Sequence, residues 1–215
     1  MSLAAGAPRI LTSEPHLPAA SLPAGTAGRI LEVGLVLFAR HGFHGTSIRD
    51  IGRELGLKPA NLYDHHPSKE HLLAELVRLG HEEHLRALQR ALVDTDGGPV
   101  DQIRAVVAAH VRLHAEYAML AVVANNEMHA LSPELVAPSL ALRKQAEGLL
   151  LDVVARGVQV GVFDVPDVFL TGAAIGGMGM RVAHWYSPSH DRSIDQLCEV
   201  YAELALRMLG VRRRR

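Results

Sequence analysis

The stretch IRDIGRELGLKPANLYDHHPSKEHLLAEL, residues 48–76, decides the fold, because its helical pattern breaks twice within a short distance. A helix with Ile51 and Leu55 on one face ends at a glycine, and a very short helix follows over about residues 58–64. Ser68 then caps a longer helix. Two helices joined by a tight glycine-containing turn predict a helix-turn-helix, whose second helix is short because only its first residues must reach base edges.

The composition of the whole chain favours an all-α fold. Of its 215 residues 48% are hydrophobic, 21% are charged and only 4% are aromatic, with Ala, Leu and Val dominant and no alternating apolar pattern. The net charge is -1, so no bulk basic signal points to nucleic acid. The one cysteine, Cys198, excludes an intramolecular disulfide. Because no apolar run reaches bilayer length and no signal-peptide pattern is present, we expect a cytoplasmic protein without a membrane partner.

The order of helices and breaks predicts two functional domains. Helices are expected over about residues 27–41, 48–55, 58–64, 69–92, 100–114, 117–130, 133–160, 167–185 and 194–209. The corresponding division is a disordered extension over 1–24, a three-helix helix-turn-helix domain over 25–72, a helical ligand-binding and dimerisation domain over 73–210, and a basic tail over 211–215.

Residues 37–76, LFARHGFHGTSIRDIGRELGLKPANLYDHHPSKEHLLAEL, resemble the DNA-binding domain of the TetR family of transcriptional regulators. The matching positions are Phe38, Gly42, Phe43, Thr46, Ser47, Ile48, Ile51, Gly56, Leu57, Lys58, Leu62, Tyr63, His65, Ser68, Lys69, Glu70 and Leu72. Two residues depart from the family pattern. Gly52 stands where Ala is usual, and His66 replaces a Phe that anchors the core of the domain.

The resemblance implies which residues contact DNA. Tyr63, His65 and Lys69 match positions that touch the phosphate backbone, a task that suits a phenol, an imidazole and an ammonium. Thr46 and Ser47 are candidates for phosphate contacts as well as for helix capping. The residues expected to face the groove are Lys58, Pro59, Ala60 and Asn61, and Arg49 is expected to reach a base or a phosphate.

The resemblance also implies that the C-terminal helices enclose a ligand cavity and pair with a second copy in a homodimer. The dimer contact is expected from the helix with the glycine-rich stretch TGAAIGGMGM, residues 171–180, and from the helix over 194–209. The expected reason for the glycines is the close approach of a partner helix or of a ligand. Arg181 and Trp185 are four residues apart, and with their surroundings they resemble, more loosely, a subgroup that senses acyl-CoA thioesters. The expected effector-binding residues are His114, Met128, Arg181 and Trp185; a purely structural Arg–Trp pair is the alternative.

Other functions have weaker support in the sequence. His110 and His114 have a spacing that can hold a metal, but no second cluster of ligands accompanies them, so neither a metal nor a cofactor is expected. No catalytic motif is present, so no enzyme is expected. The sequence therefore predicts a ligand-responsive repressor that binds double-stranded operator DNA. A helical protein that binds a lipid-like ligand without DNA and a metal-sensing repressor are the alternatives.

Overall fold

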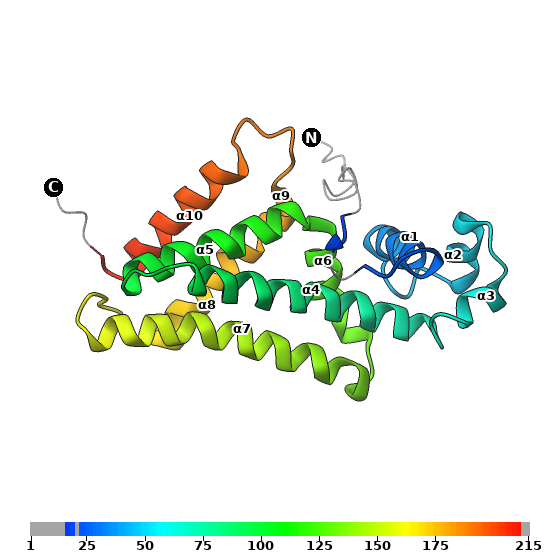
Figure 1. Cartoon of the computed structure of the whole chain (residues 1–215), viewed down its shortest axis with the longest axis horizontal. Helices are drawn as coiled ribbons and strands as arrows, with labels where there is room; N and C mark the ends of the chain where they lie inside the picture. Colours follow the sequence, from blue (N-terminus) through cyan, green and yellow to red (C-terminus); the bar gives the residue numbers. More distant parts are fainter. Residues whose placement is uncertain (1–15, 20–21, 212–215) are drawn as a thin grey trace, which may run out of the picture. The chain divides into compact units, whose positions relative to one another are not determined.

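The computed structural model describes residues 16–19 and 22–211 (Figure 1). Most of the expected extension over residues 1–24, and residues 212–215 of the expected tail, lie outside the described residues. The helices are α1 (Thr26–His41), α2 (Ile48–Leu55), α3 (Pro59–Tyr63), α4 (Lys69–Val93), α5 (Pro99–Glu116), α6 (Ala118–Asn126), the 3-10 helix η3 (Met128–Ala130), α7 (Pro133–Gln159), α8 (Val168–Met180), α9 (Val182–Trp185) and α10 (Ile194–Met208). The described ranges contain no strand, which confirms the all-α prediction.

Two of the expected helices are broken. The helix expected over 167–185 ends at Met180 and resumes at Val182, so Arg181 stands between α8 and α9. The last turn of α8 carries Gly176, Gly177 and Gly179, and each mid-helix glycine costs about 1 kcal/mol relative to alanine, which weakens the helix before the break. The segment expected as one helix over 117–130 is likewise divided into α6 and η3.

Close contacts divide the chain into two compact units. Unit 1 holds the described residues up to Glu82 together with Tyr117–Leu140 and Ala183–Ser187. Unit 2 holds Glu83–Glu116, Ala141–Val182 and the described residues from Pro188 onward. The contacts thus group α6 with the N-terminal helices, whereas the sequence analysis assigned residues 73–210 to one domain. The boundary between the functional domains at residue 72 stays a prediction.

The core of unit 1 lies around α1. The α1 helix packs against α2 and α6, and α2 packs against α3. The first half of α4 contributes to the same core. The fully buried side chains in this core include Ile30, Leu31, Leu35, Phe38, Ile51, Leu62, Leu72, Leu73, Leu76 and Leu120. The short helices α2 and α3 are therefore fixed through their apolar residues, which are buried in the core around α1.

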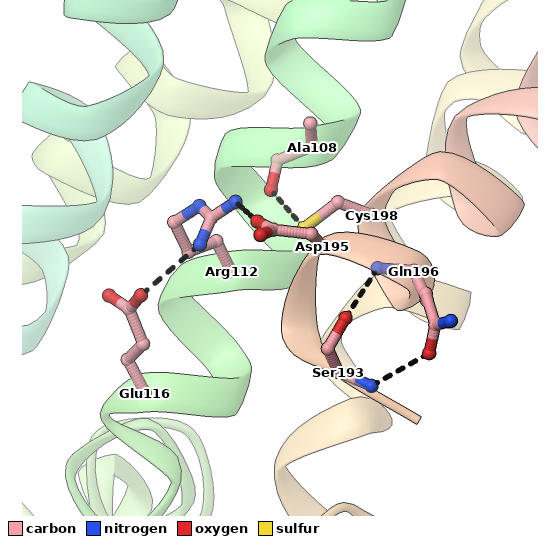
Figure 2. Close-up of polar contacts among 7 residues, drawn as sticks. All are labelled: Ala108, Arg112, Glu116, Ser193, Asp195, Gln196 and Cys198. Carbon is pink, nitrogen blue, oxygen red and sulfur yellow. Dashed lines mark hydrogen bonds and ion pairs between the residues drawn. The ribbon is translucent and has the colours of Figure 1, made fainter. Parts of the chain in front are cut away.

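In unit 2, α5 packs along α10, and polar contacts join the two helices (Figure 2). Arg112 of α5 donates to the carboxylate of Asp195 on α10 and lies 3.5 Å from the carboxylate of Glu116. The thiol of Cys198 donates to the carbonyl of Ala108 at 3.3 Å, and burial raises the pKa of this thiol. These contacts give Cys198 a structural place within the helix pair.

A helix can cross a membrane only if it is long and apolar enough, and this can be compared for each described helix. No single one is long and apolar enough to cross a bilayer. The pair α5 and α6 would qualify by length and composition if both were counted as one bent segment.

Candidate DNA-binding surface and ligand cavity

The turn between α2 and α3 is tight, and its tightness depends on glycine. Helix α2 begins with a capping box between Ser47 and Asp50 and ends at Gly56 in the left-handed conformation, with φ 66°. The amide of Leu57 then donates to the carbonyl of Gly52 at 2.8 Å. A Cβ at residue 52 would lie 2.8 Å from the carbonyl oxygen of Leu57. The glycine that departs from the family pattern is therefore required by the close approach of this turn.

The α3 helix has one buried and one exposed side. Leu62 is 1% exposed and packs in the unit 1 core, which fixes the rotation of this one-and-a-half-turn helix. The expected DNA-contact residues that lie exposed in and around α2 and α3 are Ser47, Arg49, Lys58, Pro59, Ala60, Asn61, Tyr63 and His65. Tyr63 is 52% exposed although it is aromatic. An exposed phenol and an exposed amide on one short helix are groups that can contact phosphates and base edges.

Two of the expected DNA contacts instead point inward. Thr46 is 3% exposed, and its hydroxyl donates to the carbonyls of Leu37 and Gly42 at 3.1 and 2.9 Å. The ammonium of Lys69 donates to the carbonyls of Phe43 and Thr46 at 2.6 and 2.7 Å. Burial lowers the pKa of this lysine. Both side chains hold the connection between α1 and α2, which is a structural role that the sequence did not indicate. Their contact with phosphate stays a prediction.

Two carboxylates tie the helix-turn-helix to the rest of unit 1. The amide of Phe43 donates to Glu127 at 2.9 Å, and the amide of Ser132 donates to Glu70 at 2.7 Å. These hydrogen bonds connect the α1–α2 turn and the start of α4 with the segment that follows α6. No sequence signal indicated Glu127, since its partner lies 84 residues away along the chain.

His66, the second departure from the family pattern, is buried with one unsatisfied nitrogen. The side chain is 5% exposed, and Nδ1 lies 3.3 Å from the carboxylate of Glu75. Nε2 has no hydrogen-bond partner among the described residues. Burial lowers the pKa of His66, and the Glu75 carboxylate opposes this only in part. The imidazole thus occupies a core position at a cost that an apolar ring would avoid.

We expect His66→Phe to stabilise the protein by about 1 kcal/mol at pH 7.5, because it removes a buried polar atom without a partner. The lowered pKa means that the unfolded state takes up a proton more readily than the folded state. The free energy of unfolding therefore does not depend on the protonation of His66 well above the ordinary histidine pKa of about 6.5, and it decreases as the pH falls below that value. Urea unfolding should show that the free energy of unfolding falls less between pH 7.5 and pH 5.5 in the variant than in the parent protein. Equal losses in both proteins would contradict this role of His66.

Unit 2 contains a cavity of about 360 Å³. Four helices contribute to its wall: the second half of α4, α5, α7 and α8. The lining residues are His84, Leu88, Val106, Val107, His110, Arg143, Ala146, Glu147, Leu150, Gly172, Ala173, Ile175, Gly176, Gly177 and Met180. The wall is mostly apolar, and its polar groups are two histidines, one arginine and one glutamate.

The two histidines of the wall belong to a directional chain of hydrogen bonds. Nε2 of His110 lies 2.9 Å from the carbonyl of Gly176, and since a carbonyl only accepts, this nitrogen carries the hydrogen. Nδ1 of neutral His110 is then an acceptor, to which Nε2 of His84 donates at 2.8 Å. Burial lowers the pKa of His110, in keeping with a neutral ring. The chain connects α4, α5 and α8 on one side of the cavity.

The four expected effector-binding residues lie elsewhere. The ring of His114 lies 4.4 Å from that of His110, and its Nδ1 donates to the His110 carbonyl. Met128 packs against the core of unit 1. Arg181 is exposed directly after the end of α8, and Trp185 is the last residue of α9. The cavity lining, which is drawn from the described residues, includes none of the four.

Sequence reasoning missed most of the residues that form the cavity. Of the apolar side chains on the helices expected to enclose it, Leu150 lines the wall, whereas Leu120 and Val123 are buried in the core of unit 1. Gly176, which lies in the stretch expected at the dimer contact, lines the cavity. Within the described residues, no group of three or more His, Cys, Asp or Glu side chains is arranged to hold a metal ion.

Comparisons with known proteins agree with this architecture. Residues 30–76 match the family described as bacterial regulatory proteins of the tetR family, and residues 96–209 match the tetracyclin repressor-like C-terminal domain. The HTH-type transcriptional repressor KstR2 of Mycobacterium tuberculosis is 27% identical over 181 residues, 83% of this chain and 90% of that protein.

Solved structures show the same fold. A regulatory protein of the tetR family from Rhodococcus RHA1 is 30% identical, with a TM-score of 0.82 over 88% of this chain and 100% of that one. AibR in complex with isovaleryl coenzyme A and operator DNA is 22% identical, with a TM-score of 0.75 over 83% of this chain and 96% of that one, and shows a shared fold alone. Because family descriptions match both its N-terminal and its C-terminal helices, the chain belongs to the TetR family of transcriptional regulators.

Proposed function

We propose that this DNA-binding regulator is a cytoplasmic, homodimeric repressor without enzymatic activity, which a small effector in the unit 2 cavity releases from its operator. The observation that carries the DNA-binding part is the exposed row of Lys58, Ala60 and Asn61 on a helix whose opposite side is fixed by buried Leu62. That KstR2 is named a repressor supports repression here. Displacement of the two recognition helices by the effector would break their match to half-sites about 34 Å apart.

We expect Asn61→Ala to lose discrimination at one base pair of the operator. A side-chain amide can read adenine through two hydrogen bonds, and losing this pairing costs about 1–3 kcal/mol at that site. Binding to operators mutated one base pair at a time, measured at fixed salt, should reveal a position that the variant no longer distinguishes. Arg53→Ala is the control, because Arg53 is exposed and pairs with Asp50 at 3.1 Å within α2. Unchanged discrimination in Asn61→Ala would show that α3 is not the reading helix.

The homodimer has support from an apolar surface on α8 and α10, which contact each other. Val200, Leu204 and Met208 recur every four residues on α10 and are 48%, 40% and 39% exposed. Phe169 and Leu170 on α8 are 56% and 65% exposed. Exposed apolar patches of this kind mark interaction sites, so these two helices are the proposed dimer contact.

The proposed effector is an acyl-CoA thioester. An apolar cavity suits an acyl group, and the solved complex of AibR with isovaleryl coenzyme A offers a precedent on the same fold. Arg181 stays a candidate for the charged headgroup outside the cavity, since it is exposed and directly follows Met180, which lines the wall. Trp185 stays a proposed neighbour of that headgroup, whereas His114 and Met128 have no place in the proposal.

We expect octanoyl-CoA to release the parent protein from operator DNA and free octanoate to act weakly or not at all, because the free acid lacks the CoA phosphates. Arg181→Ala should bind operator and dimerise normally but lose most of the response. Fluorescence anisotropy of labelled operator measures release, and light scattering measures the dimer. A variant that no longer dimerises would show that Arg181 is structural. A parent protein that ignores every thioester would refute the effector class and leave DNA binding intact.

A further inference from the structure

The size of the unit 2 cavity limits what part of an effector it can enclose. At about 360 Å³ the cavity lies near the lower end of the roughly 300–1,000 Å³ range of pockets that enclose small ligands. A whole acyl-CoA is several times larger, and its phosphates would be costly to bury among Leu88, Val106 and Ile175. The cavity therefore fits the acyl group alone.

The exposed members of the lining show where the cavity opens. Arg143 and Glu147 on α7 and Ala173 on α8 are exposed, whereas Val106 and Val107 on the opposite wall are buried. The opening thus lies between α7 and α8. An arginine at such an opening is a cation that can bind a carbonyl or phosphate outside the cavity.

The glycines of α8 divide into two kinds. A Cβ at Gly172 would lie 2.4 Å from the side chain of Leu151, and a Cβ at Gly179 would lie 2.2 Å from the ring of His110, so both positions need glycine for packing. A Cβ at Gly176 or Gly177 would meet nothing within 4 Å. These two glycines line the cavity, and their missing side chains leave its space open.

We propose that the cavity limits the length of the effector's acyl chain, and that Gly176 and Gly177 leave open part of the space that the chain fills. The acyl chain lies among the apolar residues, the thioester lies at the opening beside Arg143, and the CoA lies outside the cavity. The identity of the ligand in this inference rests on the proposed thioester effector. The limit on chain length depends only on the shape of the cavity.

The test is a titration with straight-chain acyl-CoA thioesters of four to sixteen carbons. Each methylene that enters the cavity should lower Kd about fourfold, and the gain should stop below sixteen carbons, at the chain length that fills the cavity. A leucine at residue 176 adds four carbons inside the cavity, so Gly176→Leu should move the optimum about four carbons shorter. Gly148→Leu is the matched control, since a Cβ there also meets nothing within 4 Å but the residue lies outside the lining. Gly177→Leu provides a second reduction of the cavity if the first variant does not fold as a dimer.

A parallel series of 1-alkanols, followed by thermal shift, separates the two proposals. A chain-length optimum with alkanols that both leucine variants shorten, without any thioester binding, would support the length limit and refute the thioester effector. Affinity that keeps rising through sixteen carbons, or an optimum that neither Gly176→Leu nor Gly177→Leu moves, would overturn the length limit.

Discussion

Lys69→Met should lower the free energy of unfolding by about 2–3 kcal/mol and weaken operator binding at least tenfold. The Lys69 ammonium donates to the carbonyls of Phe43 and Thr46 and lies 4.0 Å from the centre of the Phe43 ring. A hydrogen bond from a charged donor contributes about 1.5–3 kcal/mol, and partial hydration of the freed carbonyls offsets part of the loss. Because these carbonyls belong to the connection between α1 and α2, its loosening would spread to the position of α3.

The salt dependence of operator binding distinguishes this role from the phosphate contact expected from the sequence. A lost phosphate contact reduces the slope of log K against log salt by about 0.9, with stability unchanged. A structural lysine leaves that slope unchanged while the urea midpoint falls. Lys58→Met is the control, because Lys58 is exposed at the start of α3 and should show the opposite pair of results. A normal urea midpoint in Lys69→Met would restore the original expectation.

Gly179→Ala should destabilise the protein by about 3 kcal/mol and abolish effector binding. The new Cβ would lie 2.2 Å from Cδ2 and 2.7 Å from Nε2 of His110, so the imidazole must move away from the carbonyl of Gly176. Because His110 is buried, the displaced ring loses its packing and its hydrogen bond to Gly176, and water has no access to replace that hydrogen bond. The displaced ring also leaves its place in the wall of the cavity.

The matched control for this prediction is Gly148→Ala. A Cβ at residue 148 meets nothing within 4 Å, and alanine is the better helix former, so this variant should gain up to about 1 kcal/mol. Urea unfolding and thermal shift with octanoyl-CoA provide the two measurements. If Gly179→Ala proves as stable as Gly148→Ala and still binds the thioester, the packing of α8 against His110 has no role in the cavity.

Several features that depend on neighbouring residues along the chain were correctly predicted, namely the caps and ends of α2 and the start of α4. Ser47 caps α2 and Ser68 caps the start of α4, where its hydroxyl accepts from the amide of His71 at 3.2 Å. Gly56 ends α2 as expected. Spacing within a helix and the chemistry of its caps are local properties, so the sequence indicates both them and the exposed row on α3.

The tertiary structure alone decided which of these side chains remain available to bind other molecules. Lys69 reaches carbonyls 23 and 26 residues away, and Glu127 reaches an amide 84 residues away. The ligand cavity, too, takes its wall from four helices, each of which has buried apolar residues that could belong to any core. Helical periodicity shows that a residue faces inward, but only the packing of other helices decides whether it meets a carbonyl, another side chain or an open cavity.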